Sequence, residues 1–412
     1  MKYGCIGEHL KHSFSKEIHN SLADYDYEIC EIERERLPQF AKERDFLAIN
    51  VTIPYKELIM PYLSYIDGAA EKIGAVNTVV NRGGSLYGYN TDFYGMTELI
   101  RHAGVEIRGK KVAILGTGGT SKTAAAVAAY LGADKILQVS RGQKSGAVSY
   151  ERLYKEHSDT EIIINTTPVG MFPSIYGCPV ELERFTRLSG VIDAVYNPLR
   201  TPLIRRAHEL GVPAEGGLYM LVAQAVRASE IFLDKKYGEG EGDRVYKKII
   251  SEKENVVLVG MPASGKSTVG RMLAQRLGKK FIDTDSLIVE KAKMSIPEIF
   301  AREGEAGFRL LEREVISEVA AESCAVISTG GGAVLAPENN DALRANGRIY
   351  FLDRSPALLV PTSDRPLSSS VSDMEKRYRE RYGIYTAVAE KRIENDGSPE
   401  AAVNEIIKDF LK

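Results

Sequence analysis

The chain has 412 residues, which is too long for one ordinary hydrophobic core, so two or three domains are expected. Hydrophobic residues make up 44% and charged residues 27% of it, as in globular proteins. The net charge of -2 gives no electrostatic reason to expect binding to nucleic acid or to an anionic membrane. The four cysteines are scattered without a CxxC pair, so the spacing indicates neither a zinc site nor a disulfide framework.

The first residues, MKYGCIGEHLKHSFS, lack the apolar core of a secretory signal, and no apolar run reaches ~18 residues. We therefore expect a soluble, reduced, cytoplasmic protein. The sequence does not indicate its oligomeric state.

Short apolar strands alternate with helical patterns along the whole chain, which predicts an α/β fold. Before the middle of the chain, strands are expected at residues 2–7, 27–32, 47–54, 110–116, 134–141, 161–167 and 190–196. A hairpin is expected to turn at Gly83-Gly84, and a helix over 120–132 to end at Gly132.

Residues 234–255 are charged and glycine-rich and predict a linker with a short helix. Because VVLVG then opens a new α/β unit, the main boundary is placed near residue 250.

The strand at 110–116 runs into Gly116-x-Gly118-Gly119 and then into a helix, which is the layout of a dinucleotide-binding loop. Glycines let the backbone approach a pyrophosphate, although a plain turn between a strand and a helix also favours glycine. The next strand ends in VSRGQK rather than in an acidic residue. Arg141, with Lys144, suits a 2′-phosphate and favours NADP; the alternative is a solvated surface arginine.

Two residues before that loop are candidates for proton chemistry. Lys56 follows a strand and a proline in NVTIPYKE, and Asp92 opens a predicted helix in YNTDFYG. Taken separately, Lys56 is a surface lysine and Asp92 an N-cap. Beside a nicotinamide, a lysine and a carboxylate can hold a hydroxyl and relay its proton.

The segment from residue 1 to about 240 resembles the shikimate dehydrogenase family. The resemblance rests, in order, on HSFSKEIHN, NVTIPYK, GAVNTVV, GYNTDFYG, GTGGTSKT, INTTPVGM and GLYMLVAQA. It implies NADP-linked interconversion of 3-dehydroshikimate and shikimate, with Lys56 and Asp92 as the catalytic pair. It implies that the substrate contacts are Ser13, Ser15, Thr52, Asn77, Asp92, Tyr196 and Gln224. It implies that the NADP contacts are Gly116, Gly118, Gly119, Thr120, Ser140, Arg141, Lys144 and Gly217.

This segment departs from the family pattern at two places. The usual Asn-Arg-Thr at the 2′-phosphate site is Ser140-Arg141-Gly142, which keeps the arginine. The methionine usually found two residues before the substrate tyrosine is Ala194. Neither change removes a catalytic group.

A second phosphate loop, GMPASGKST, matches G-x-x-x-x-G-K-[ST] at Gly260, Gly265, Lys266 and Ser267, between a strand and a helix. Its amides are expected to cradle phosphates, Lys266 to reach the β and γ oxygens, and Ser267 to bind Mg²⁺. In KFIDTD, Asp283 and Asp285 end the next strand; one carboxylate can serve Mg²⁺ and the other the acceptor hydroxyl, or one is only an N-cap. STGGGAV is a further glycine turn that a substrate can approach, or a plain turn.

Residues 254–412 resemble the shikimate kinase family, through the phosphate loop, DTD, EGEAGFRLLE, TGGG, DRPL and RERYGIYTAVA. The resemblance implies an ATP site at Gly260, Ala263, Ser264, Gly265, Lys266, Ser267, Thr268 and the lid arginine Arg365. It implies a shikimate site at Asp285, Arg309, Gly330, Gly331, Gly332 and Arg381, with metal contacts at Ser267 and Asp283. Lys266, Asp285 and Arg365 would be the catalytic residues. Pro361 stands where many relatives carry an arginine, so lid closure is expected to differ.

Together these resemblances predict a bifunctional enzyme that reduces 3-dehydroshikimate with NADPH and then phosphorylates shikimate with ATP and Mg²⁺. The expected layout is a substrate domain over 1–95, rejoined by a helix over 218–240, a Rossmann-like NADP domain over 96–217, a linker over 241–253 and a P-loop kinase domain over 254–412. One alternative is a quinate-type NAD dehydrogenase joined to another small-molecule kinase. Another is a ligand-sensing regulatory protein in which one or both active sites are inactive.

Overall fold

The computed structural model describes residues 1–8, 10, 14–142, 146–359 and 371–411. The chain forms two compact units, each considered separately below. The first unit contains Met1–Met171, Gly177–Asn197 and Leu203–Ile249. The second contains Ile250–Lys412 and two short segments from earlier in the chain, Phe172–Tyr176 and Pro198–Pro202.

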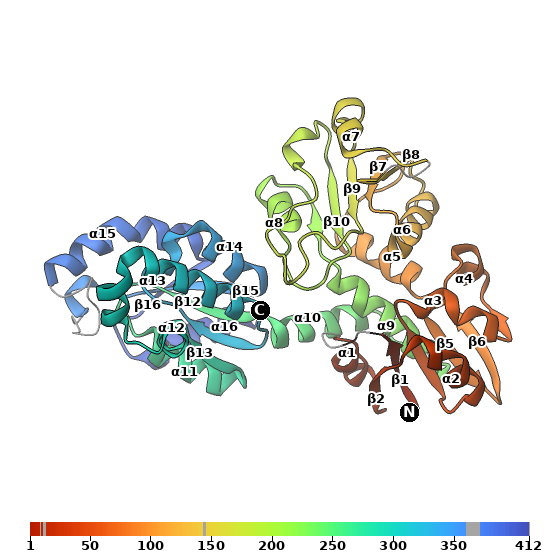
Figure 1. Ribbon diagram of the computed structural model, residues 1–412, viewed down its shortest axis with the longest axis horizontal. Coiled ribbons are helices and arrows are strands. Elements are labelled where there is room, and N and C mark those ends of the chain that lie inside the picture. Colours follow the sequence, from red (N-terminus) through yellow and green to blue (C-terminus); the bar gives the residue numbers. More distant parts are fainter. Residues whose placement is uncertain (9, 11–13, 143–145, 360–370, 412) are drawn as a thin grey trace. The chain divides into compact units, whose positions relative to one another are not determined.

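The first unit contains two sheets (Figure 1). One is mixed and six-stranded in the order β2-β1-β3-β5-β6-β4. Its strands are β1 (Tyr3–Gly7), β2 (Tyr27–Glu31), β3 (Ala48–Val51), β4 (Tyr65–Ile66), β5 (Thr78–Arg82) and β6 (Ser85–Tyr89). Strands β5 and β6 form the hairpin predicted at Gly83-Gly84, where both glycines have positive φ. Because β3 also pairs antiparallel with β5, the carboxyl ends of β3 and β6 meet the start of β5 at one edge.

The other sheet of this unit is parallel throughout, in the order β11-β10-β9-β7-β8. Its strands are β7 (Lys111–Leu115), β8 (Lys135–Val139), β9 (Ile162–Asn165), β10 (Gly190–Asp193) and β11 (Ala214–Glu215). Strands β9 and β10 are buried along their whole length, as expected for a sheet covered on both faces.

Two helices, α5 (Asp92–His102) and α9 (Leu218–Leu233), pack against each other between these two sheets (Figure 1). They approach closely because α5 carries Gly95, where a Cβ would lie 2.7 Å from the carbonyl oxygen of Met220 on α9. Apart from α10, which is described below, the other α-helices of the unit are α1 (Ser15–Leu22), α2 (Leu37–Glu43), α3 (Tyr55–Leu58), α4 (Gly68–Ile73), α6 (Gly119–Tyr130), α7 (Tyr150–Glu156) and α8 (Pro202–Glu209), whose first residue belongs to the second unit.

The predicted linker is mostly helical. Helix α10 (Glu241–Lys253) spans 13 residues and stops one residue before the next strand, so a helix does form within the predicted linker, residues 234–255, and occupies most of its second half. Val245 and Ile249, four residues apart, form a buried apolar stripe that outweighs the charged composition. Beyond Ile249, Lys279 Nζ donates to three main-chain carbonyls, those of Ser251, Glu252 and Glu254.

The second unit is built on a parallel five-stranded sheet in the order β13-β14-β12-β15-β16. Its strands are β12 (Asn255–Val259), β13 (Lys280–Asp283), β14 (Ala325–Ser328), β15 (Gly347–Asp353) and β16 (Lys391–Glu394). Its helices are α11 (Lys266–Leu277), α12 (Thr284–Ala292), α13 (Ile296–Ala320), α14 (Pro337–Asn346), α15 (Val371–Val388) and α16 (Pro399–Phe410).

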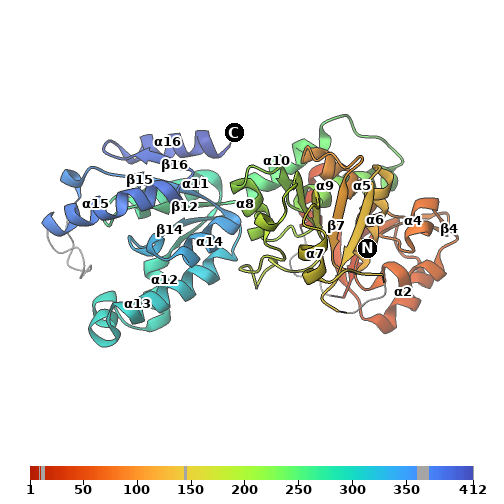
Figure 2. The ribbon, with the colours of Figure 1, turned by 90° about the horizontal axis from the view of Figure 1, so that it is seen from above.

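Both faces of this sheet are covered by helices (Figure 2). Val256 and Leu258 of β12 pack with α11 and α16, whereas Val257 and Val259 pack with residues of α13 and α14. This alternation follows from the two-residue period of a strand. Because helices cover both faces, the polar loops gather at the carboxyl edge of the sheet.

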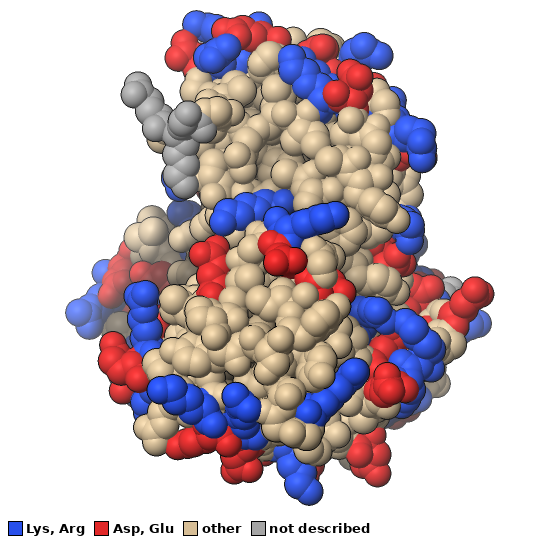
Figure 3. Space-filling view, turned by 90° about the vertical axis from the view of Figure 1, so that its right-hand side faces the viewer, with Lys and Arg blue, Asp and Glu red and all other residues tan. Residues whose placement is uncertain are grey.

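Lysine and arginine side chains are interspersed with acidic ones on the face of the molecule drawn in Figure 3, in keeping with the net charge of -2. Within the described part of the chain, no helix combines the length and the apolar character needed to cross a membrane.

Two candidate active sites

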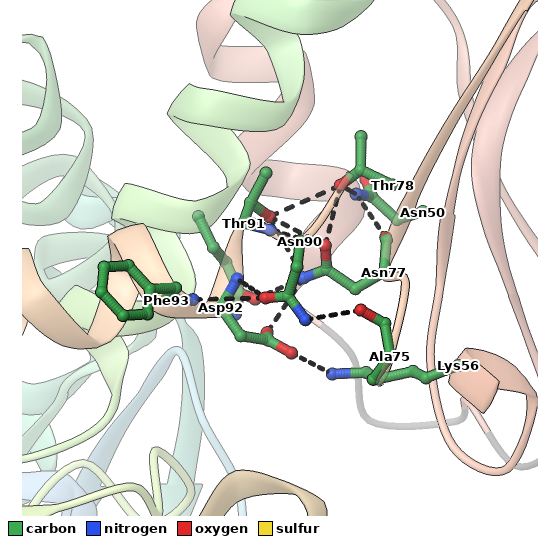
Figure 4. Close-up of polar contacts among 10 residues, drawn as sticks. Asn50, Lys56, Ala75, Asn77, Thr78, Asn90, Thr91, Asp92 and Phe93 are labelled. Carbon is green, nitrogen blue, oxygen red and sulfur yellow. Dashed lines mark hydrogen bonds and ion pairs between the residues drawn. The ribbon is translucent and has the colours of Figure 1, made fainter. Parts of the chain in front are cut away.

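The first candidate site lies at the edge where β3 and β6 end and β5 begins (Figure 4). Lys56 Nζ lies 2.5 Å from Asp92 Oδ2, and these side chains are 27% and 11% exposed. Asn77 Nδ2 donates to Asp92 Oδ1 over 2.9 Å and faces Gln224 Oε1 at 3.5 Å. The structure therefore brings together four of the residues named from the sequence.

Asp92 is the first residue of α5, but it does not act as the N-cap considered above. The helix start is held by Asn90, whose Oδ1 accepts from the backbone N–H groups of Asp92 and Phe93 at 3.0 and 3.3 Å. The Asp92 carboxylate is thereby left to face Lys56 and Asn77 (Figure 4).

A second layer of polar residues, which the sequence reasoning missed, supports Asn77. Asn50 Nδ2 donates to the Asn77 carbonyl and to Thr78 Oγ1, both at 3.2 Å, and Thr78 Oγ1 donates to Asn77 Oδ1 at 3.0 Å. Behind it, Tyr27 donates to Asn50 Oδ1 at 2.7 Å. The available signal was a polar residue in the otherwise apolar strand β3.

The buried His19 extends this layer. Its ring stacks on Tyr27 with centroids 4.0 Å apart, and its Nδ1 lies 2.6 Å from the Tyr25 hydroxyl. Burial lowers the pKa of His19 to about 3, although its interaction with the Asn50 side chain opposes the shift, so the ring is neutral at physiological pH.

The remaining predicted substrate contacts are less closely tied to this cluster. Tyr196 follows β10 and packs edge-on against Phe14 with centroids 5.6 Å apart; burial raises the pKa of its hydroxyl. Ser15 opens α1, and Thr52 follows β3 with its N–H donating to the Ile6 carbonyl at 3.0 Å. Ser13 lies outside the described residues.

The glycine loop after β7 has the form that a dinucleotide needs. Gly116 has φ of 110°, and a Cβ there would lie 2.8 Å from Thr166 Oγ1. Gly118 and Gly119 have open space where a Cβ would stand, and α6 begins at Gly119 with Thr120 in its first turn. The loop therefore presents bare backbone and a helix N-terminus to a ligand.

The residues predicted for the adenosine end lie after β8. Ser140 Oγ accepts from the Gly142 N–H at 3.2 Å, and Arg141 is exposed. Lys144 lies outside the described residues. Gly217, expected near the nicotinamide, is fixed by close packing, because a Cβ there would lie 2.2 Å from the Ala194 carbonyl oxygen.

The second candidate site is a cavity of about 550 Å³ in the second unit, at the carboxyl edge of its sheet. Within the phosphate loop, Gly260 and Gly265 have φ of 146° and 92°, and Ala263 also has positive φ. Lys266 Nζ donates to the Gly260 and Met261 carbonyls at 2.9 and 2.7 Å, and Ser264 is fully buried. Thr268 also lines the cavity, in the first turn of α11.

A metal ion fits the groups beside this loop. Ser267 Oγ donates to Asp283 Oδ2 at 2.7 Å, so a hydroxyl and a carboxylate, both ligands that Mg²⁺ accepts, face each other at the phosphate position. Asp283 also N-caps α12 by accepting from the Ser286 N–H. Its position therefore fits both roles considered for it, metal contact and helix N-cap. Among the described residues, no cluster of three His, Cys, Asp or Glu side chains could hold a metal by itself.

The other end of the cavity is lined by Gly330–Gly332, Asp285 and two arginines. Cβ atoms at Gly330 and Gly332 would lie 2.6 Å from Asp285 Oδ1 and 2.4 Å from the Arg309 guanidinium, so bare glycines let these groups close in. Arg381 Nη1 donates to the Gly331 carbonyl at 2.9 Å. Arg365 lies outside the described residues.

Glu312, which the sequence reasoning missed, orients Arg309. It is 1% exposed, and its Oε2 accepts from Arg309 Nη1 at 2.7 Å. Burial raises its pKa, although Arg309 opposes the shift. The glutamate three residues after Arg309 in RLLE was the available signal.

These sites define a chain with a Rossmann-type oxidoreductase unit and a P-loop kinase unit. The family model for the shikimate dehydrogenase substrate binding domain matches residues 5–79, and the shikimate kinase family model matches residues 262–411. The NADP(+) shikimate dehydrogenase of Clostridium beijerinckii is 38% identical over 260 residues, covering 58% of this chain and 95% of that protein.

Solved structures agree. Shikimate dehydrogenase 1 from Peptoclostridium difficile matches with a TM-score of 0.55 and 36% identity, over 60% of this chain and 98% of that one. Shikimate 5-dehydrogenase from Thermus thermophilus, solved with NADP(H) and shikimate, matches with a TM-score of 0.55 and 25% identity, over 60% of this chain and 99% of that one. The chain belongs to the shikimate dehydrogenase family and continues into a shikimate kinase domain, which confirms the bifunctional shikimate-pathway enzyme expected from the sequence.

Proposed function

We propose that the first unit reduces 3-dehydroshikimate to shikimate with NADPH, and that the second transfers a phosphoryl group from ATP to the hydroxyl so formed, giving shikimate 3-phosphate. The observation that carries this proposal is that each unit gathers the groups that one reaction needs. Lys56, Asp92 and Asn77 meet at one sheet edge, whereas Lys266, Ser267 and Asp285 line one cavity.

In the reduction, the bound nicotinamide would supply a hydride to the ketone carbon. The Lys56 ammonium would donate a proton to the ketone oxygen as negative charge develops there. Asp92 holds that ammonium in place, and Asn77 fixes the Asp92 carboxylate through its other oxygen.

The remaining residues of the first site would bind the substrate. Gln224 and Tyr196 would contact the remaining ring hydroxyls, and Ser13 and Ser15 would contact the substrate carboxylate. Support for NADP comes from Arg141 and from relatives named for that cofactor.

In the phosphoryl transfer, Asp285 would accept a hydrogen bond from the attacking hydroxyl. Arg309 and Arg381 would bind the substrate carboxylate, beside the bare amides of Gly330–Gly332. Lys266 and the loop amides would hold the β- and γ-phosphates of ATP. A magnesium ion held by Ser267 and Asp283 would neutralise phosphate charge, and Arg365 would cover the nucleotide.

The test uses purified protein with 3-dehydroshikimate, NADPH and ATP-Mg²⁺, with products identified by mass. Shikimate 3-phosphate should form, and it should be lost in both Lys56→Ala and Lys266→Ala. Shikimate should still accumulate in Lys266→Ala. Shikimate alone from the unmodified protein would contradict the kinase half, and quinate and NAD⁺ as better substrates would contradict the assigned specificity of the first unit.

A further inference from the structure

The cavity of the second unit has different groups on its two sides. Strands β13 and β14 end at Asp283 and Ser328, beside the groups proposed for the metal and the acceptor. On the other side of β12, strand β15 ends at Asp353 and is followed directly by Arg354, which also lines the cavity. Because β14 and β15 flank β12, their ends are about 10 Å apart. Arg354 therefore lies on the side away from the acceptor groups.

Arg354 reaches the phosphate loop. Its Nη1 lies 4.0 Å from the point where a Cβ on Gly265 would stand, which places the guanidinium over the residue preceding Lys266. Asn395 lies on the same flank, with Nδ2 2.8 Å from that point and donating to the Ser264 carbonyl at 2.8 Å. A charged group at this position faces the backbone that would hold the β-phosphate.

The guanidinium has no competing partner in the described part of the chain. Its Nε is buried without a hydrogen-bond partner, and no described carboxylate forms an ion pair with it. The neighbouring Asp353 is already engaged, because it accepts from Arg392 Nε at 2.7 Å and from the Tyr378 hydroxyl at 3.0 Å. A buried N–H donor without an acceptor is costly, so an anionic ligand at this place would relieve that cost.

We propose that Arg354 binds the phosphate chain of the nucleotide from the β15 side of the loop, as a donor additional to Lys266 and the loop amides. A guanidinium offers two parallel donors to phosphate oxygens, which suits this role better than a single ammonium. The proposal rests on the proposed kinase function and deepens it. It makes Arg354 a determinant of nucleotide affinity and leaves shikimate binding to Arg309 and Arg381.

The test compares the full-length protein with Arg354→Ala and Arg354→Lys. Calorimetric titration with ADP and Mg²⁺ should show about 10- to 100-fold weaker binding to the alanine variant, and an intermediate affinity for the lysine variant. Inhibition of the kinase reaction by inorganic tripolyphosphate should weaken by a similar factor. The KM for shikimate and the dehydrogenase rate should not change. Arg379→Ala, in which an arginine side chain 79% exposed on α15 is removed, is the matched control and should bind ADP normally.

The outcomes separate this proposal from the one on which it rests. ADP bound equally by the unmodified protein and by Arg354→Ala, with kinase activity present, would overturn the role of Arg354 alone. Weaker ADP binding with unchanged tripolyphosphate inhibition would place the contact at the nucleoside and overturn the phosphate assignment. A raised KM for shikimate instead would move Arg354 to the acceptor. Absence of any ADP binding by the unmodified protein would overturn the kinase function and the role of Arg354 with it.

Discussion

The Nζ atom of Lys56 lies 2.5 Å from Asp92 Oδ2, although the two residues are 36 positions apart in the chain. Lys56→Ala removes the group proposed to donate the proton, so the kcat for reduction should fall about 10²- to 10⁴-fold. The kinase rate with added shikimate should be unchanged. Lys72→Ala, at an exposed position on α4, is the control, and both rates are read in separate assays. An equal loss in both variants would contradict the assignment.

Asn50→Ala should impair reduction, although Asn50 is not one of the proposed substrate contacts. The change removes the donor to the Asn77 carbonyl and Thr78 Oγ1 and leaves the Tyr27 hydroxyl without its acceptor. We expect a loss of about 1–3 kcal/mol in the free energy of unfolding, together with a lower kcat. Asn81→Ala is the matched control, because Asn81 also bonds backbone groups but lies at the far end of β5. It should cost stability and leave kcat unchanged; an equal kcat in the two variants would rule out a positioning role for Asn50.

His19 should make the first unit less stable in acid. Its folded-state pKa of about 3 lies below the ordinary value of 6.5, so between these values the unfolded chain binds a proton that the folded chain does not. The free energy of unfolding therefore falls as the pH drops below about 6.5, by up to about 1.4 kcal/mol per pH unit.

Urea titrations of the unmodified protein and of His19→Gln, read by hydrogen exchange in peptides from α1, check this expectation. Other titrating groups act in both proteins. The difference between the free energies of unfolding of the two proteins therefore reports the contribution of His19. That difference should shrink as the pH is lowered from about 7 to about 4. A constant difference would show that His19 titrates normally in the folded state.

Gly332→Ala should weaken shikimate binding to the kinase while preserving the fold. The added Cβ would lie 2.4 Å from the Arg309 guanidinium, which is the end of a flexible side chain and can move away. The KM for shikimate should rise about tenfold or more, as expected when a charge-assisted contact is displaced, and the KM for ATP should not change. Gly383→Ala, on α15 with open space around the new Cβ, is the control. A rise in both KM values would indicate a distorted cavity instead.

The sequence alone led to both families and to the α/β order of elements, because those signals are local. One such signal is a glycine that needs positive φ, as at Gly116, Gly260 or Gly265. Another is a strand that runs into a helix N-terminus. Both depend on neighbouring residues. Lys266 and Ser267 follow from the same short motif. The sequence also predicted a helix within residues 234–255 but did not give its bounds, which depend on the burial of Val245 and Ile249.

Only the tertiary structure decided which polar groups share a site. Asn50 and Glu312 had only weak signals in the sequence, a polar residue in an apolar strand and the spacing from Arg309, and the sequence assigned no role to His19 or Arg354. Their roles arise from strand order: antiparallel pairing of β3 and β5 sets Asn50 beside Thr78, and the order β14-β12-β15 brings Arg354 to Gly265. Local propensity fixes backbone loops, whereas the burial and pairing of distant side chains depend on how the whole chain packs.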